Sequence, residues 1–531
     1  MINFSKTYDV VIVGGGPVGM GLAIDLGQRG HSVAVVERQL KLHNVPKGQN
    51  LTQRTMEHFQ AWHCEDEIRA ARLVPKDYAI GGMTSFETLL SGYHYDWLQR
   101  DLVAPYYNAA NERLPQYQTE SVLRARAEKV PGVDVALGWT ATGLEQGKDS
   151  ATVILREAAG QGAELTGRYV VGSDGARSAI RDLAGISQTK RDHDKLMVLL
   201  VFRSEKLHEY LDRYPGKQFY CVLDRELEGY WMFFGRVDLG TTWFFHAPVP
   251  LGTTRDNFDF KAYLERAVGA PIDVAFDHVG FWDLRIALAD CYGKGRVFIA
   301  GDACHSHPPY GGYGVNTGLE DARNLGWKLS AMLQGWGGNG LLASYTDERR
   351  PVFDGTATHF IERFIREDRD FLNAHHPRDE GEEAFRHAWD TRNEGSSEVM
   401  AFAPNYQGSP IVTGEPGQPD ARGTHEFRAR AGHHLAPATL ADGRTVYDAL
   451  GPGFTLLALG AAGGTADVFA SVAAGLGLPF TVVTQKEGGD AAKQYGASLV
   501  LVRPDSYVAW AGNDATDAAA ILARARGEVS A

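Results

Sequence analysis

The sequence predicts a protein of the α/β plus α+β class, in which a parallel sheet flanked by helices is combined with a separate antiparallel sheet. Three observations support this prediction. An apolar, β-branched run at Tyr8–Val13 leads into a glycine-rich turn and a helix-like segment. Two later apolar runs, ending near residues 172 and 300, each run into an aspartate. Short alternating runs between residues 191 and 279 indicate an antiparallel sheet with one buried face.

The N-terminal segment has the pattern of a dinucleotide site. The first strand is followed by GGGPVG, a helix-like run to Leu26, a second strand at Val33–Val36 and the acid Glu37, about 20 residues after the glycines. In such a Rossmann-like unit the glycines allow a tight turn, close approach of backbone amides to a pyrophosphate, and close packing of helix on strand. The helix N-terminus favours the negative charge. The candidate ligands are Gly14, Gly16, Pro17, Val18, Gly19 and Glu37.

Two further strands carry an aspartate just past their ends. "YVVGSDGARSAIR" places Asp174 after the run at 169–172, and "GRVFIAGDACH" places Gly301 and Asp302 after the run at 297–300. Ligands of α/β sheets bind outside the carboxyl ends of the strands. A second GxGxxG pattern, at residues 335–340, follows a helix-like run and is interpreted as a helix end and loop.

These three segments, in this order, resemble the class A flavoprotein monooxygenases, the aromatic hydroxylases of the 4-hydroxybenzoate hydroxylase and phenol hydroxylase type. The first motif is similar to the FAD fingerprint of that family, Asp174 to its DG motif, and Gly301-Asp302 to its GD motif. The run "GDACHSHPPYGGYGVNTGLEDARNLGWKL" resembles the family almost throughout. The resemblance covers about residues 7–375 and implies non-covalently bound FAD.

The resemblance also implies how FAD is held. Asp302 binds the ribityl chain, the glycines after Pro309 let the isoalloxazine lie against the backbone, and a helix beginning near Val315 directs its N-terminus at the flavin. Lys47 stands where the family usually has arginine, and Arg38 is placed near the adenosine. The further FAD candidates implied in this way are Arg38, Lys47, Gln118, Pro309, Gly312, Gly314, Val315 and Asn316.

The reaction implied by the resemblance is hydroxylation of a phenolic or related electron-rich ring. NADPH or NADH reduces the flavin, O2 forms a flavin C4a-hydroperoxide, and the ring attacks its distal oxygen. Two alternatives remain open: a flavin oxidase or dehydrogenase that inserts no oxygen, and a non-catalytic flavin-binding assembly protein. Phenols, nitrophenols, hydroxypyridines and polyketide phenols all remain possible substrates.

Candidates for binding and deprotonating the ring lie mainly in the antiparallel sheet. On "TTWFFHAP" a period of two places Thr242, Phe244 and His246 on one face, and His246 has the pKa best suited to a general base. A hydrogen-bonded structural histidine is the competing interpretation. Further catalytic candidates are Tyr220, Arg285 and Pro309, and further pocket candidates are Tyr310, Tyr313 and Arg236.

The domain organisation is predicted to be discontinuous. The C-terminal order of strands and helices resembles the thioredoxin-like domain of phenol hydroxylase relatives, and it contains no cysteine, which excludes dithiol chemistry. The expected parts are an FAD-binding domain at 1–75, 100–183 and 285–375, a substrate domain at 76–99 and 184–284, a connector at 376–424 and a thioredoxin-like domain at 425–531.

Bulk properties exclude several other classes. The 531 residues carry a net charge of −13 without a basic patch, so no nucleic-acid partner is expected. No apolar stretch long enough to span a membrane and no secretory signal are present, which favours a cytoplasmic enzyme. His305 and His307 lack a third ligand nearby, so no metal site is expected. The expected partners are a small aromatic substrate, O2 and a second copy of the chain in a homodimer.

Overall fold

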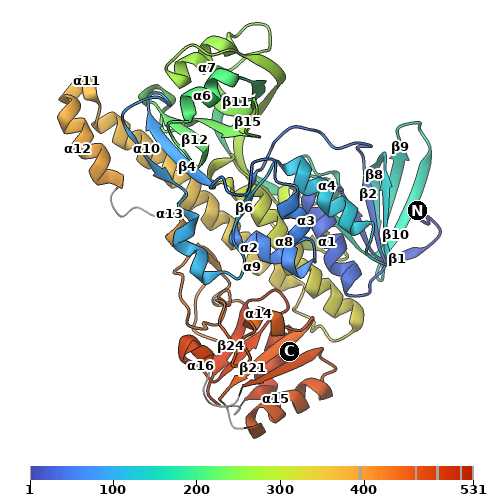
Figure 1. Cartoon of the computed structure of the whole chain (residues 1–531). Coiled ribbons are helices and arrows are strands. Elements are labelled where there is room, and N and C mark those ends of the chain that lie inside the picture. Colours follow the sequence, from blue (N-terminus) through green and yellow to red (C-terminus); the bar gives the residue numbers. More distant parts are fainter. Residues whose placement is uncertain (1, 394–397, 461–462, 486–489, 515–516, 529–531) are drawn as a thin grey trace.

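A computed structural model of the chain describes residues 2–393, 398–460, 463–485, 490–514 and 517–528. Its three main sheets each have their own hydrophobic core. Figure 1 shows the first two sheets side by side with long helices between and beneath them, and the C-terminal sheet below. The expected α/β plus α+β fold is confirmed.

The first sheet is built around β1, whose residues Val10–Val13 are almost fully buried between layers. It pairs in parallel with β10 and β2, and β17 and β7 extend the sheet in parallel on either side. The strands are β1 (Thr7–Val13), β2 (Val33–Glu37), β7 (Val133–Leu137), β8 (Trp139–Gln146), β9 (Ala151–Glu157), β10 (Gly162–Gly172), β16 (Gly293–Lys294) and β17 (Val297–Ile299).

Helices α1, α4 and α8 pack together against this sheet. Helix α1 begins at Pro17, whose fixed φ suits a first helical position, and α8 ends at Gly335 in the left-handed conformation, so the second GxGxxG pattern is indeed a helix end. The helices of this part are α1 (Pro17–Gln28), α2 (Gln53–Ala61), α3 (Glu65–Ala70), α4 (Gln116–Ala127), α5 (Ala179–Leu183), α8 (Tyr313–Gln334), α9 (Ala343–Ala357) and α10 (Arg363–Ala374), with a short ribbon of β3 (Asn50–Leu51) and β6 (Glu112–Arg113) nearby.

The parallel register brings the carboxyl ends of four strands to one edge. Val13 lies beside Val36 and Gly172, and Gly172 lies beside Ile299. The segments that follow these strands therefore meet in space although they are nearly 300 residues apart in the sequence. This edge is where an α/β sheet binds its ligands.

The second sheet has the order β18-β15-β11-β14-β13-β12-β4-β5 and is antiparallel except at the β12–β4 pair. Helices α6 and α7 cover one of its faces. Alternation is clear on β14, where Trp243, Phe245 and Ala247 pack beneath these helices while Phe244 and His246 face the other way. The elements are β4 (Gly81–Phe86), β5 (His94–Trp97), β11 (Gln188–Arg203), β12 (Lys217–Leu223), β13 (Trp231–Arg236), β14 (Thr242–Val249), β15 (Ala275–Ala289), β18 (His305–Ser306), α6 (Glu205–Leu211) and α7 (Phe260–Val268).

The C-terminal sheet has the order β22-β21-β23-β24, with β22 parallel and β23 antiparallel to β21, as in a thioredoxin-like core. Its elements are α14 (Val446–Ala449), β21 (Phe454–Leu459), α15 (Gly463–Gly475), β22 (Phe480–Gln485), α16 (Asp490–Tyr495), β23 (Leu499–Val502), β24 (Val508–Gly512) and α17 (Ala518–Ala525). The preceding stretch contains α11 (Pro377–Glu380), α12 (Glu382–Asn393), α13 (Glu398–Ala401), β19 (Phe402–Asn405) and β20 (Asp420–Arg422). Of the helices described, none is both long enough and apolar enough to cross a membrane.

The turn between β23 and β24 docks on α8 and α9 through a buried charge network. Arg503 donates to both oxygens of Glu348, at 2.6 and 2.9 Å, and to Asp505 at 2.6 Å. Lys328 donates to the same Glu348 at 2.8 Å. All four side chains are buried, and the two cations hold the pKa of Glu348 well below its usual range despite burial. The C-terminal domain is therefore joined to the helix that starts at the first sheet's ligand edge.

Candidate active site

A cavity of about 870 Å³ lies between the carboxyl edge of the first sheet and the face of the second sheet opposite α6 and α7. One end is formed by the loops after β1, β2, β10 and β17 and by α4, and we call it the FAD end. The other end is formed by aromatic side chains of β5, β12, β13, β14 and β15, and we call it the aromatic end. Residues predicted from the sequence line both ends: Gly14, Gly16, Pro17, Val18, Glu37, Arg38, Lys47, Phe244, His246, Asp174, Asp302, Pro309, Gly312, Gly314 and Val315.

The first glycine motif has the geometry that its sequence predicts. Gly14 adopts φ +111°, and a Cβ there would lie 2.3 Å from the carbonyl oxygen of Ser173. A Cβ on Gly19 would lie 2.0 Å from the carbonyl oxygen of Gly14, which explains its packing role, although Gly19 itself does not line the cavity. A Cβ on Gly16 would meet nothing within 4 Å, so its backbone is open to the cavity.

Two acids at the FAD end shape the loops around them. Glu37 Oε2 accepts from the Gly15 amide at 2.7 Å, which fixes the glycine turn against the end of β2. Asp174 accepts from the Ala179 amide at 2.7 Å and from the Ser178 hydroxyl, and so caps the start of α5. Both carboxylates also line the cavity.

Asp302 opens onto the cavity from the short turn after β17. Desolvation raises the pKa of its carboxyl above 3.8, and the electrostatic interactions with His305 and Lys47 oppose that rise. Gly301 before it has φ +63°, and a Cβ there would lie 2.9 Å from Val18, so Gly301 packs beneath the site and is not among the lining residues. His305, beside it, is paired with Asp321 at 2.7 Å.

The start of α8 faces the middle of the cavity. Gly311 and Gly312 both have positive φ, at 63° and 70°, and turn the chain into the helix. Gly314 and Val315 line the cavity, in the first helical turn, where backbone N–H groups have no partner within the helix. The Asn316 side chain points elsewhere: its Oδ1 accepts from the Thr52 amide at 3.0 Å and from the Thr55 hydroxyl at 2.6 Å.

Five aromatic side chains form the wall of the aromatic end: Trp97, Phe219, Phe233, Phe244 and Trp282. Their rings meet at edges and tilted faces, with centroids 5.6 Å apart for Trp97 and Phe219 and 5.4 Å apart for Phe233 and Phe244. Such a wall excludes water and offers ring faces and edges to another planar ring.

His246 is the imidazole of this wall, with its centroid 5.5 Å from that of Phe244 and 6.4 Å from that of Trp282. It is 7% exposed, and burial lowers its pKa to about 4. The ring is therefore neutral at pH 7. Its Nδ1 is buried and has no hydrogen-bond partner within the described ranges.

Several substrate candidates lie outside the cavity, and the structure corrects them. Tyr220 alternates with the wall residue Phe219, so it points beneath α6, where its hydroxyl donates to the Lys217 carbonyl at 2.8 Å. Arg236 is buried on the same side and donates to the Tyr220 hydroxyl at 3.2 Å. Thr242 shares a face with Phe244 but lies beyond the end of the cavity.

Three more candidates are corrected in the same way. Arg285 lies on β15 opposite Asp192, and its side chain does not reach the cavity. Tyr310 packs against Trp231, with ring centroids 3.8 Å apart. Tyr313 lines a second, smaller cavity and donates its hydroxyl to Glu398. Alternation or a helical turn directs each of these side chains away from the large cavity.

Gln118, expected near the cofactor, is not among the residues of α4 that line the cavity. On α4 the residues that line the cavity are Gln116, Tyr117, Glu120 and Arg124. Gln116 accepts from the Gly48 amide at 3.2 Å, beside Lys47. The sequence contains two glutamines two residues apart, and a helix directs such positions to different faces.

Some lining residues were missed by sequence reasoning. They include Gln49, Arg113 and His307, each of which has at least one buried side-chain polar atom without a protein partner among the described residues, as does Arg124 at Nε. Unsatisfied buried polar atoms are unusual in folded proteins and fit a polar ligand. Together with the open backbone at Gly16 and at Gly175, the unpartnered polar atoms of Gln49, His307 and Arg124 show that the residues present fit FAD.

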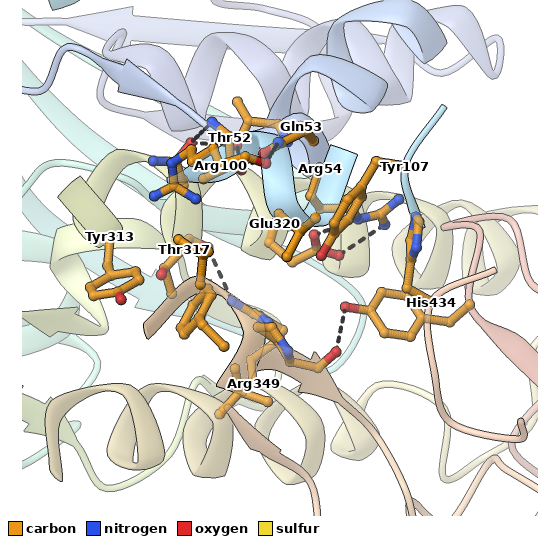
Figure 2. Close-up of a pocket in the computed structure, with 18 residues that line it drawn as sticks. Thr52, Gln53, Arg54, Arg100, Tyr107, Tyr313, Thr317, Glu320, Arg349 and His434 are labelled. Atoms are coloured by element: carbon orange, nitrogen blue, oxygen red, sulfur yellow. Dashed lines mark hydrogen bonds and ion pairs between the residues drawn. The ribbon is translucent and has the colours of Figure 1, made fainter. Parts of the chain in front are cut away.

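The smaller cavity, of about 70 Å³, is lined in part by the first turns of α8, through Tyr313, Thr317 and Glu320 (Figure 2). Arg54 of α2 donates to Glu320 of α8 at 2.9 Å, and His434 and Tyr507 approach from the C-terminal domain. Glu398 connects the linings of the two cavities by hydrogen bonds. It accepts from the hydroxyl of Tyr313, which lines the smaller cavity, and, at 3.3 Å, from the indole of Trp97 in the wall of the large cavity.

Comparisons with known proteins agree with this geometry. The model of a family described as "FAD binding domain" matches residues 7–359, and that of "Aromatic-ring hydroxylase, C-terminal" matches residues 428–529. The chain is 31% identical to 4-methyl-5-nitrocatechol 5-monooxygenase of a Burkholderia species, over 95% of this chain and 94% of that protein.

Two solved structures are similar over almost the whole chain. The flavin-dependent monooxygenase PieE, in complex with FAD and substrate, has a TM-score of 0.85 at 25% identity and covers 98% of this chain and 99% of its own. Aklavinone-11 hydroxylase, in a ternary complex with FAD and aklavinone, has a TM-score of 0.82 at 25% identity over 99% of both chains. The chain therefore belongs to the FAD-binding aromatic-ring hydroxylases and is an FAD-dependent monooxygenase.

Proposed function

We propose that the enzyme uses NADPH or NADH and O2 to hydroxylate a phenolic ring bound at the aromatic end of the cavity, with His246 as the group that takes the phenolic proton. The observation that carries this proposal is the continuity of one cavity from the FAD end to a wall of five aromatic rings and one neutral imidazole. A phenol bound there would lie between the wall and the start of α8.

The chain's own groups have separable tasks. Bound FAD supplies the redox chemistry, accepting a hydride and activating O2. Phe233, Phe244 and Trp97 orient the substrate ring and exclude water, which limits loss of oxygen as peroxide. The amides of Gly314 and Val315 direct the positive end of α8 at negative charge on the reduced cofactor.

His246 would act on the substrate. Because its pKa is about 4, the ring is unprotonated at neutral pH and can accept the phenolic proton. Removing that proton makes the substrate's aromatic ring more nucleophilic toward the oxygen atom that is transferred from O2. The same burial that weakens the imidazole as a base in water favours a hydrogen bond to a phenol that is buried with it.

The experiment is oxidation of NADPH and of NADH by the FAD-loaded enzyme, with and without a panel of phenols, nitrophenols, hydroxypyridines and polyketide phenols. We expect one class to stimulate turnover and to acquire one ¹⁸O atom from ¹⁸O2. Turnover without oxygen insertion would instead support an oxidase or dehydrogenase. Label arriving only from water would reject the proposal.

A further inference from the structure

Arg113 is a buried arginine of β6 that lines the large cavity. It is 3% exposed. Its Nη1 donates to the Gln218 side-chain oxygen at 2.8 Å, and its Nη2 is buried without a partner among the described residues. One terminal nitrogen of the charged guanidinium, Nη1, thus donates to a neutral amide, whereas the other, Nη2, donates to no described protein group.

The charge of Arg113 is not balanced locally. In the described parts of the chain, no carboxylate forms an ion pair within 4 Å of its guanidinium, whereas buried Arg54, Arg349 and Arg503 each have at least one. Burial lowers the pKa of Arg113 to about 9, and the positive charges of Arg236 and Arg72 act in the same direction, while Tyr220 opposes them. Arg113 stays protonated at pH 7, and an uncompensated buried charge is strongly unfavourable.

The position of Arg113 indicates which ligand would supply the missing charge. The guanidinium lies 5.8 Å from the ring centroid of Phe219, part of the aromatic wall. The carboxylates that line the cavity, on Glu37, Glu120, Asp174 and Asp302, belong to the strand ends and α4 at the FAD end. Arginine is suited to anionic oxygen because its fixed donors make charge-assisted hydrogen bonds.

We propose that Arg113 binds a negatively charged oxygen on the substrate, such as a ring carboxylate, and so selects anionic phenols over neutral ones. This inference rests on the proposed function, since it takes the aromatic end as the substrate site. It replaces Arg236 and Arg285, the arginines that the sequence suggested for an anionic substrate, because neither lines the cavity.

The test measures binding, not turnover. Isothermal titration calorimetry of the FAD-loaded enzyme at pH 7.5 compares 2-, 3- and 4-hydroxybenzoate with the matching hydroxybenzamides, which keep the shape but lose the charge. We expect at least one acid to bind about 10-fold or more tightly than its amide, from one charge-assisted hydrogen bond. Arg113→Met should abolish that preference, and Arg113→Lys should keep part of it.

Arg285→Met is the matched control, because it removes an arginine on β15 that does not reach the cavity, and it should leave the preference unchanged. FAD content and thermal melting report whether each variant is folded. The proposal is overturned if no acid is preferred by the wild type, if Arg113→Met keeps the preference, or if that variant folds but loses FAD, which would make the cofactor the partner of Arg113. An enzyme that shows the preference but never inserts oxygen would refute the hydroxylation proposal alone.

Discussion

The two ends of the large cavity differ in which part of the polypeptide determines their shape. At the FAD end glycines set the course of the backbone: Gly14 needs a positive φ, Gly16 leaves open space, and Gly312 turns the chain into α8. At the aromatic end the surface consists of side chains that alternate on strands, and their neighbours one position away face a different core. The first kind of site restricts residue type at fixed spacing, whereas the second restricts only shape and polarity.

The largest expected effect sharpens this contrast at the FAD end. Gly14→Ala would place a Cβ 2.3 Å from the Ser173 carbonyl oxygen, in a conformation that L residues avoid. We expect FAD affinity to fall at least about 100-fold, from strain together with displacement of the loop after β10. Flavin absorbance after gel filtration and melting with and without added FAD measure the loss.

Gly443→Ala is the control for strain alone, since Gly443 has φ +86° in open space within the C-terminal domain. It should lower stability slightly and leave FAD content unchanged. Equal FAD loss in both variants would show that the glycine turn has no special part in binding.

The next effect belongs to the aromatic end. His246→Ala should slow oxygen transfer by about 10²–10⁴-fold if the imidazole assists proton removal. A larger share of the O2 consumed should then be released as hydrogen peroxide. Stopped-flow absorbance with peroxide quantified separates slow transfer from loss of FAD. Normal transfer and normal peroxide would leave His246 as a structural member of the wall.

The pH dependence of this step has a defined sign. The pKa of His246 is lowered to about 4, so protonation removes the base only as pH falls toward 4, and transfer should be flat from pH 6 to 8 in the wild type. In His246→Ala the rate should rise with pH as the phenol ionises unaided. The same shift makes folding less favourable as pH falls from 6.5 to 4, by up to about 3 kcal/mol, because the unfolded chain takes up the proton first. A pH titration of denaturant unfolding checks this.

A smaller effect is expected at Asp302. Asp302→Asn keeps the size of the side chain but removes the charge that opens onto the cavity, and loss of one charge-assisted hydrogen bond should weaken FAD binding about 10–100-fold. Fluorescence titration of FAD measures the constant. Asp149→Asn, at an 86% exposed side chain outside the cavity, should have no effect.

The smallest effect tests the connection between the two cavities. Glu398→Gln has one side-chain oxygen in place of two, so it cannot accept equally from both Trp97 and Tyr313. We expect the fraction of NAD(P)H that yields product to fall a few-fold, an effect of about the free energy of one neutral hydrogen bond. Trp97→Phe removes the same contact from the other side. If Glu398 acts through Trp97, the double variant should resemble the single ones, and additive losses would refute the link.

The sequence predicted the fold, and it also picked out most of the proposed FAD residues that line the cavity, for a physical reason. Glycines and strand-end aspartates at fixed spacings leave a pattern, and the expected strand at Tyr8–Val13 lies within β1. The substrate residues could not be ranked in the same way, since choosing Tyr220 over Phe219 requires knowing which face of β12 is covered by α6. Arg113 gave no signal at all, because an arginine is ordinarily exposed and only the fold shows that this one is buried.

The contact between Arg503 and Glu348 has a consequence for exchanging parts among relatives. A C-terminal domain transplanted without its partners on α8 and α9 would leave Lys328 and Glu348 facing a foreign surface, with buried charges unmatched. Chimaeras should therefore be cut so that the β23–β24 turn travels together with both helices. The thioredoxin-like domain therefore cannot be exchanged independently of α8 and α9.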